Sequence, residues 1–371
     1  MKKIVLIKCM FIWITFACGQ DIHPDYTITD KVSHQCTPVL SQGKTGTCWS
    51  FSTTSFIESE IMRLGHGNHN LSELFQVRNI YLDKAQNYIL RKGKDQFGQG
   101  ALAHDVLKSI DKYGVIPHEV YNGFSISGET TYDHEQMVPL LKAMVDAAVT
   151  GKMLSKNWWK SYNAVLDVYI GKRPESFTYN NKTYTPHEYA KELGIVTENY
   201  ISITSFTHHP VNSTFILEIP DNFSNGKYYN VELDELQRIV DTALKNGFTV
   251  SWDGDVGETG FNKEVGIAVL TDEETPEKVF KKYVTEKKVT PKSRQIEFER
   301  YNTTDDHLMH IVGKATDKRG KAYYKVKNSW GTEGDYNGYI YMSEAYFRMK
   351  TIAIMLHKDG ITSDIKQKLE L

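Results

Sequence analysis

Apolar residues recur at helical spacing through most of the first half of the chain. In the segment 48–65, Trp49 and Phe56 alternate with small polar residues, as in a largely buried helix. Thr47 is a suitable N-cap for this helix and Gly65 a suitable stop. The same periodicity predicts further helices at 72–93, 101–114 and 185–194, with a longer helical block over roughly 133–166.

The pattern changes at about residue 199, where short β-branched and aromatic segments alternate with turn residues. One helical segment, 233–247, interrupts them. The chain therefore divides into a helical part at about 30–198 and a β-rich part at about 199–371. This is an α+β plan, and a cleft is expected where the two parts meet. The predicted strands are 200–206, 212–219, 227–233, 248–257, 264–270, 308–317, 321–330 and 338–347.

The first 19 residues have the form of an export signal. A basic start, an apolar run and small residues near Ala17–Gly19 predict a signal peptide at 1–19, cleaved near its end. Lys8 interrupts the apolar run, which is short for a transmembrane span, so the mature chain is expected to have none. The predicted location is periplasmic or extracellular. Two alternatives remain open: a lipid anchor on Cys18, and an uncleaved N-terminal anchor.

Charge and cysteine content exclude several classes of function. The 44 basic and 46 acidic residues nearly balance, so no overall field attracts nucleic acid. Of four cysteines, only Cys36 and Cys48 clearly lie beyond the signal, which is too few for a disulfide framework. His307 and His310 are the nearest approach to a metal pair, but they lack the glutamate of the HExxH helix. No metal site and no cofactor are expected.

Cys48 has several interpretations when it is taken alone: a buried inert thiol, half of a disulfide, a metal ligand or a nucleophile. Its predicted place at a helix N-terminus favours the reactive thiolate, through the helix dipole and free backbone N–H groups. A nucleophilic thiol also needs a base, a group that orients the base, and donors for an oxyanion.

The segment 305–331 offers a base and an orienting group. It reads as a β-hairpin with its turn at 317–320, and antiparallel pairing about that turn brings His307 beside Asn328. His310, three residues further along the strand, is expected on the opposite face. An imidazole held by an amide oxygen suits a Cys–His peptidase.

Three motifs resemble those of papain-like cysteine peptidases: QGKTGTCWSF at 42–51, HLMHIVG at 307–313 and KNSWG at 327–331. Thr45 stands where papain itself has a cysteine. This substitution, the large helical insertion and the segments 111–121 and 248–257 resemble the bleomycin hydrolase and aminopeptidase C branch. The resemblance covers roughly residue 37 to the C-terminus. It implies a papain-like fold at 20–371, with the active site in the cleft between a helical and a β-rich subdomain.

The resemblance also implies roles for individual residues. Cys48 is the expected nucleophile, His307 the general acid and base, and Asn328 the group that orients His307. The side-chain amide of Gln42, with the backbone N–H of Cys48, is the expected oxyanion hole. Trp330 is expected to shield the His–Asn pair. Gly100 and Ala101 lie near the place where the family's Gly-Gly binds the substrate backbone.

The implied substrate is a peptide, and three functions stay open. The first is an aminopeptidase of bleomycin hydrolase type. In that branch a C-terminal arm enters the cleft and its carboxylate meets the substrate amine, whereas ITSDIKQKLEL at 361–371 resembles the last helix before such an arm. The second is therefore an endopeptidase with an unblocked cleft, and the third an inactive binding protein. The branch also implies a homohexamer.

Overall fold

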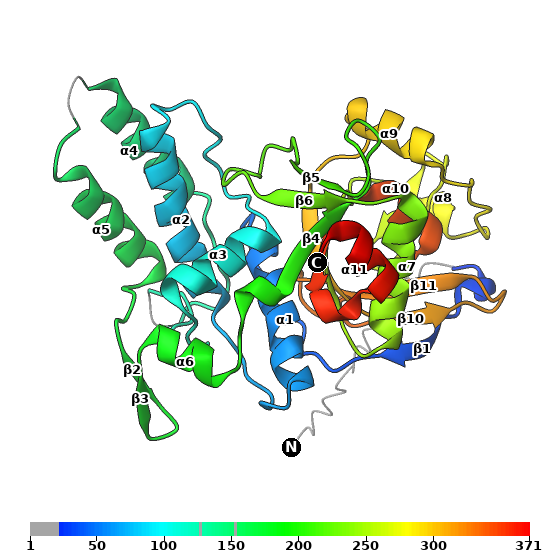
Figure 1. Cartoon of the computed structure of the whole chain (residues 1–371), viewed down its shortest axis with the longest axis horizontal. Coiled ribbons are helices and arrows are strands. Elements are labelled where there is room, and N and C mark those ends of the chain that lie inside the picture. Colours follow the sequence, from blue (N-terminus) through cyan, green and yellow to red (C-terminus); the bar gives the residue numbers. More distant parts are fainter. Residues whose placement is uncertain (1–21, 126–127, 152–153) are drawn as a thin grey trace, which may run out of the picture.

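The computed structural model describes residues 22–125, 128–151 and 154–371, so the predicted signal peptide and Cys18 lie outside the described residues. Helices form one half of the molecule and a large sheet with its own helices forms the other, with α1 between them (Figure 1). No helix in the described ranges combines the length and apolar character that crossing a membrane requires.

The predicted helices of the first half are all present. The long block expected over 133–166 consists of two helices, and a small hairpin that was not predicted follows them. It turns at Asn180 and Asn181, both with positive φ, which suits a tight two-residue turn. The bounds are α1 (Cys48–Arg63), α2 (Glu73–Leu90), α3 (Ala103–Tyr113), α4 (Met137–Thr150), α5 (Trp158–Ile170), β2 (Phe177–Tyr179), β3 (Lys182–Tyr184) and α6 (Pro186–Glu192).

The second half is a mixed sheet with the strand order β5-β6-β4-β13-β7-β10-β11-β12-β9-β8, and β1 pairs with β10. Only the β4–β6 and β9–β12 pairs are parallel. The strands are β1 (Thr29–Ser33), β4 (Tyr200–Thr204), β5 (Ser213–Ile216), β6 (Lys227–Asn230), β7 (Val250–Gly254), β8 (Phe261–Asn262), β9 (Ile267–Ala268), β10 (His307–Thr316), β11 (Ala322–Lys327), β12 (Tyr339–Ser343) and β13 (Thr351–His357). The helices are α7 (Leu233–Lys245), α8 (Pro276–Val279), α9 (Pro291–Glu299), α10 (Glu344–Lys350) and α11 (Ser363–Leu369), with single 3-10 turns at Pro24–Tyr26, Thr197–Asn199 and Lys358–Gly360.

Several parts of this half differ from the sequence expectation. Besides the one helical segment that was expected at 233–247, it contains helices α8, α9 and α10 and the unpredicted strand β8. The strand predicted at 338–347 ends at Ser343, whose Oγ accepts the N–H of Tyr346 and caps α10. Strands β1 and β13 were not predicted. Every residue of β13 is buried, so its sequence is a continuous apolar run without the alternation of a half-exposed strand.

Strand β10 has α1 on one face and α7 on the other. Leu308 belongs to the core that contains Cys48, while Met309 and Ile311 belong to the core formed with α7. This alternation follows from the two-residue period of a strand. Because α1 carries Cys48 and β10 begins at His307, their packing sets the distance between the two halves of the expected site.

Gly313 tests how tightly β1 and β10 approach each other. A Cβ on Gly313 would lie 2.1 Å from the carbonyl oxygen of Val32, which is backbone and cannot rotate away. We expect Gly313→Ala to lower the free energy of unfolding by about 1–3 kcal/mol, as overpacked sites do. Urea unfolding measures this, with Gly257→Ala as control, because a Cβ there meets only ordinary contacts at 3.4 Å. Equal stability of the two variants would contradict the close approach.

Candidate active site

Cys48 is the first residue of α1 and is 8% exposed. Thr47 occupies the N-cap position as predicted, but its hydroxyl lies 2.6 Å from that of Thr45 and does not cap the helix. The first-turn N–H groups therefore receive no bond from that side chain. Cys48 and Cys36 are both free thiols, and Cys36 Sγ lies 3.3 Å from the hydroxyl of Tyr339. The disulfide interpretation of Cys48 is thereby removed.

His307 and Asn328 meet as the hairpin argument predicted. Nε2 of His307 lies 2.7 Å from Oδ1 of Asn328, and the same oxygen accepts the N–H of Ser329 at 2.7 Å. Two donors on Oδ1 fix the orientation of the amide. The neutral imidazole therefore carries its proton on Nε2, and Nδ1 is left as the acceptor.

The predicted register of the hairpin formed by β10 and β11 was wrong. His310 pairs with Lys327, two residues from the partner that the sequence predicted. An irregularity between Ile311 and Gly313 moves the pairing by one further residue. Asn328 lies beyond the end of β11 and reaches His307 through its side chain. Up to Ile311 the pairing of β10 with β7 is regular, so His307 and His310 keep opposite orientations.

Trp330 covers His307. Their rings stack with centroids 4.5 Å apart and an interplanar angle of 28°, and Phe261 meets the edge of Trp330. The Trp330 position is fixed by backbone pairing with the loop before α1, because Ser41 forms a bridge with Trp330 and the N–H of Gly331 bonds to Leu40. The indole therefore limits access of water to the imidazole.

The side chain of Gln42 is held from both ends. Its Oε1 accepts the hydroxyl of Ser329 at 2.6 Å and its Nε2 donates to the carbonyl of Thr45 at 2.5 Å. The backbone N–H of Gln42 also bonds to the carbonyl of Ser329. One N–H of the amide remains free for another acceptor, which is the arrangement expected of an oxyanion donor.

Burial dominates the protonation of the two reactive groups. It raises the pKa of the Cys48 thiol to about 12, and the charges of Asp305 and Asp253 act in the same direction, while backbone groups of Leu308 and Trp49 oppose it. Burial also lowers the pKa of His307 to about 4. Both shifts favour a neutral thiol and a neutral imidazole.

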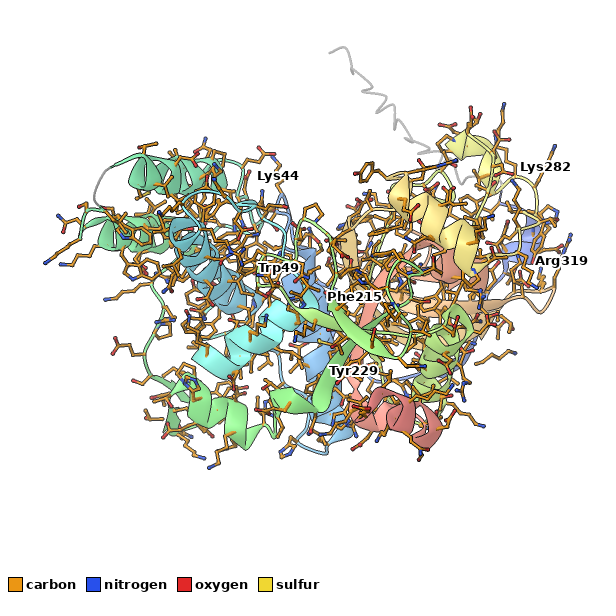
Figure 2. The ribbon with its side chains drawn as sticks, turned by 45° about the horizontal axis from the view of Figure 1, so that its top comes forward. Lys44, Trp49, Phe215, Tyr229, Lys282 and Arg319 are labelled. Carbon is orange, nitrogen blue, oxygen red and sulfur yellow. The ribbon has the colours of Figure 1, made fainter. Side chains whose placement is uncertain are left out.

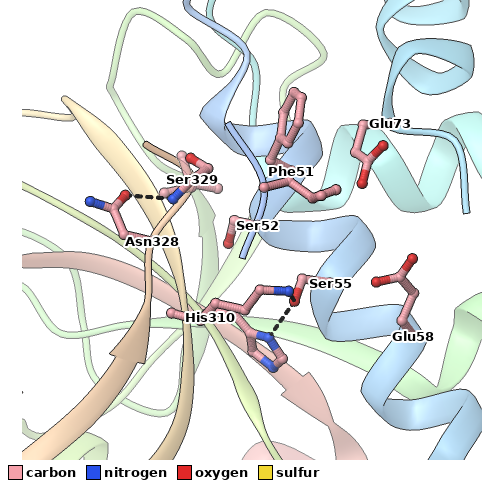
Figure 3. Close-up of a pocket in the computed structure, with 11 residues that line it drawn as sticks. Phe51, Ser52, Ser55, Glu58, Glu73, His310, Asn328 and Ser329 are labelled. Carbon is pink, nitrogen blue, oxygen red and sulfur yellow. Dashed lines mark hydrogen bonds between the residues drawn. The ribbon is translucent and has the colours of Figure 1, made fainter. Parts of the chain in front are cut away.

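A buried polar network lies behind the site, between α1 and the β10–β11 hairpin (Figure 3). Lys327 Nζ donates to Ser55 at 2.8 Å and to Thr37 at 2.9 Å, and Thr37 donates to Glu58 at 2.6 Å. Nδ1 of His310 lies 2.9 Å from the Ser55 hydroxyl. His310 is thus a structural partner of α1 rather than a second ligand beside His307.

The segment with Gly100 and Ala101 lies next to the start of α1. The indole N–H of Trp49 donates to the carbonyl of Gln99 at 2.9 Å, and the Gln99 side chain accepts the N–H of Gly46 at 2.7 Å. Ala101 is only 1% exposed as a whole residue, whereas Gly100 is partly exposed, so Gly100 is the more accessible of the two. The structure places both residues near Cys48, and their substrate contact stays a prediction.

One group of side chains could hold a metal ion. Among the described residues, only His208, His209 and Glu218 bring three ligand atoms within 4.8 Å of one another. Both imidazoles contact the carboxylate, at 3.2 and 2.7 Å. This group lies between β4 and the end of β5, away from the α1–β10 junction, so it takes no part in the chemistry of Cys48.

The sequence analysis missed two acidic residues whose charges act on the thiol. Asp253 is in β7 and Asp305 lies two residues before His307. The pair of acids at 305–306, directly before the histidine motif, was a visible signal for one of them. Nothing in the sequence indicated that Asp253 faces the same place, because that depends on the pairing of β7 with β10.

Comparisons with known proteins agree with this geometry. A family model described as "Peptidase C1-like family" matches residues 87–371, and one described as "Papain family cysteine protease" matches residues 25–135. Aminopeptidase C of Lactococcus lactis subsp. cremoris is 23% identical over 369 residues, covering 88% of this chain and 82% of the relative. Bleomycin hydrolase of Rattus norvegicus is 22% identical over 386 residues, with coverages of 90% and 83%.

The fold itself is shared with a solved structure. The crystal structure of PepW from Lactobacillus rhamnosis HN001 has a TM-score of 0.74 and 18% sequence identity, covering 92% of this chain and 84% of that one. The predicted α+β papain-like fold is therefore confirmed.

Because the imidazole of His307 is buried, the stability of the folded protein should depend on pH. The imidazole pKa of about 4 lies below the ordinary value of 6.5, so between these values the unfolded chain binds a proton that the folded chain does not. Stability should be full above pH 6.5 and fall as the pH drops toward 4, by about 3 kcal/mol for this group. Urea unfolding across this range should show a weaker pH dependence in His307→Gln than in the unaltered protein. Identical pH dependence would contradict a neutral buried His307.

Proposed function

The chain belongs to the Peptidase C1-like family, and we propose that it is a cysteine aminopeptidase that removes residues from the N-terminus of peptides. The observation that carries the proposal is the 2.7 Å contact between His307 Nε2 and Asn328 Oδ1 at the junction with the Cys48 helix. The relatives named aminopeptidase C support the exopeptidase part of the proposal.

The proposed catalytic cycle assigns one step to each of these side chains. Nδ1 of His307 takes the thiol proton as Cys48 Sγ attacks the scissile carbonyl, and the tetrahedral oxyanion meets the Gln42 Nε2–H and the Cys48 N–H. The imidazolium then gives its proton to the leaving amine, which leaves an acyl-enzyme. Water, deprotonated by the same imidazole, hydrolyses the thioester and restores the thiol.

The orientation of the imidazole is the main contribution of Asn328. Its oxygen accepts the Nε2 proton and adds no charge, so the ring keeps Nδ1 toward the thiol in both protonation states. Stacking on Trp330 holds the ring plane and excludes water. Gly100 and Ala101 are proposed to bind the substrate backbone through their peptide groups.

An endopeptidase remains the alternative, because of the position of the last helix. Ile365 and Leu369 of α11 lie in the core with α7, and Asp364 bonds to Arg238 of α7 at 2.8 Å. This is the face of β10 opposite to Cys48, and Leu371 folds back onto Lys366. Leu371 therefore lies on the α7 side of the sheet and not beside the thiol.

The predicted location is also part of the proposal. We infer export through the segment 1–19, supported by its basic start and apolar run, with a lipid anchor at Cys18 as the alternative. The homohexamer implied by the resemblance remains a proposal supported by the long matches to the branch.

Peptide pairs test the function. We expect a peptide with a free amine to be cleaved at least tenfold faster than its N-acetyl form, and Cys48→Ala to lose roughly 10⁴-fold or more in turnover. Cys36→Ala, which removes the other free thiol of the described residues, should keep turnover and inhibition by an epoxysuccinyl compound.

Equal turnover of the two peptides would favour the endopeptidase. Activity of Cys48→Ala would contradict the nucleophile assignment, and failure of the epoxysuccinyl compound to label Cys48 would favour a binding protein.

Mass spectrometry of the protein recovered from its native host tests export. The expected product begins after Ala17–Gly19 and is released from the cells or the periplasm. A diacylglycerol adduct that Cys18→Ala abolishes would establish the lipid anchor instead. Recovery of the intact N-terminus, Met1 included, would contradict both.

A further inference from the structure

Asp253 is a buried carboxyl group with no N–H or hydroxyl donor among the described residues. It is 5% exposed, and the polar side chain that it meets is another carboxyl group, that of Asp305. Burial of such a group is costly unless a charge or a donor compensates it. Asp253 lines a small cavity together with Ala103 of α3, Tyr228 of β6 and Leu308 of β10. The carboxyl group therefore faces a space between the two halves of the molecule.

Asp305 is a second acidic residue close to the thiol of Cys48. Its Oδ2 also lacks a hydrogen-bond partner among the described residues, and it lies two residues before His307. Asp253 pairs in register with Leu308, the residue directly after His307. Both carboxyl groups are close enough to the thiol to raise its pKa. Two acids that contact each other, with no hydrogen-bonded basic partner among the described residues, thus lie near Cys48.

Asp221 brings a third carboxylate to the same region from the β5–β6 connection. Strands β5 and β6, which carry Phe215 and Tyr229, lie beside α3 (Figure 1, Figure 2). A Cβ on Gly100 would lie 1.8 Å from Asp221 Oδ2, so this carboxylate stands directly over the Gly100 backbone. Within the described ranges only Gln96 donates to it, at 2.7 Å. The β5–β6 connection therefore covers one side of Gly100, which is proposed to bind the substrate backbone.

The nearby charges do not neutralise the three acids. Lys84 is the basic residue that acts on Asp221 and Asp305, and its Nζ is bonded to the carbonyl of Gly100. Asp105 is engaged with the N–H of Leu102 and with Ser224, and Asp306 with Thr304. Burial and the neighbouring carboxyl groups raise the pKa of Asp305 to about 7 and that of Asp253 well above its ordinary value, so a bound cation is needed to keep both acids ionised.

A metal ion does not fit this arrangement. The oxygens of Asp221, Asp253 and Asp305 do not form a set of three within 4.8 Å in the described part of the chain. An organic cation spans such separations better, because its N–H groups can bond to one or two carboxylates and its charge acts on the others.

We propose that Asp221, Asp253 and Asp305 form a cation subsite that holds the ammonium group of the peptide being cleaved. This rests on the proposed function, and it supplies the group that recognises the amine on the Cys48 side of the sheet. The ammonium group comes either from the peptide N-terminus or from a basic side chain just before the scissile bond. A cation at this point also offsets the negative charge that faces the thiol.

Binding to a protein without the nucleophile tests the subsite apart from catalysis. Calorimetry with Cys48→Ala compares Ala-Ala amide, N-acetyl-Ala-Ala amide and N-acetyl-Lys-Ala amide. We expect the free-amine ligand to bind at least tenfold more tightly than its acetyl form. In Asp253→Asn and Asp305→Asn, added to Cys48→Ala, this difference should fall to less than threefold. Tighter binding of the lysine ligand alone would identify the cation as a side chain.

Asp95→Asn is the matched control. Asp95 also acts on Lys84, but it lies 3.5 Å from Arg91, whose charge offsets it, so the tenfold difference should remain. Equal binding of all three ligands to Cys48→Ala, or an undiminished difference in every aspartate variant, would overturn the subsite. Should Asp253→Asn fail to fold, Asp305→Asn and Asp221→Asn give the same comparison.

Kinetics separate this inference from the proposed function. In the active protein Asp305→Asn should raise KM for the free-amine peptide at least tenfold, with a smaller effect on kcat and normal labelling of Cys48 by an epoxysuccinyl compound. Failure of the proposed function would instead appear as absent turnover and labelling in the unaltered protein, while the binding comparison would still decide the subsite.

Discussion

The packing of α1 against β10 is the contact on which the site depends. Cys48 begins one element and His307 begins the other, so their separation is set by how the helix and the strand meet. Lys327, buried between them, donates to Ser55 of α1 and to Thr37, which in turn bonds to Glu58 of α1. Removing one partner from a buried hydrogen-bonded network costs about 1–3 kcal/mol, because a buried polar group is then left unsatisfied. The network therefore fixes the helix on the hairpin in one position.

The loop before α1 also holds Gln42 and Trp330 in fixed positions relative to α1. Backbone bonds join Gln42 to Ser329 and Leu40 to Gly331, so the residues on either side of Trp330 are tied to the start of the nucleophile helix. The Gln42 amide and the Trp330 ring are consequently placed by one short antiparallel contact. A shift of α1 relative to the sheet would move the nucleophile, the base and the oxyanion donor together or break several hydrogen bonds at once.

Local patterns predicted the helices around the site well, and they predicted the sheet less well. The start of α1 at Cys48 was correct because the apolar spacing of its buried face is visible in the sequence. Strand β13 was missed because it is buried on both faces, and β1 because it lies at an edge with mostly exposed residues. The hairpin register was wrong by two to three residues, since Asn328 lies beyond the ladder and an irregularity follows Ile311.

By itself, the sequence was enough to propose the reactive groups and their order, because Gln42, Cys48, His307 and Asn328 lie in motifs that keep a recognisable local spacing. It also determined the division into a helical half and a β-rich half. Only the tertiary structure decided which charges surround the thiol. Asp221, Asp253 and Asp305 are separated by tens of residues, and each belongs to a different strand or connection. Their convergence depends on strand pairing and on the path of the β5–β6 connection, which are set by long-range packing that no local pattern encodes.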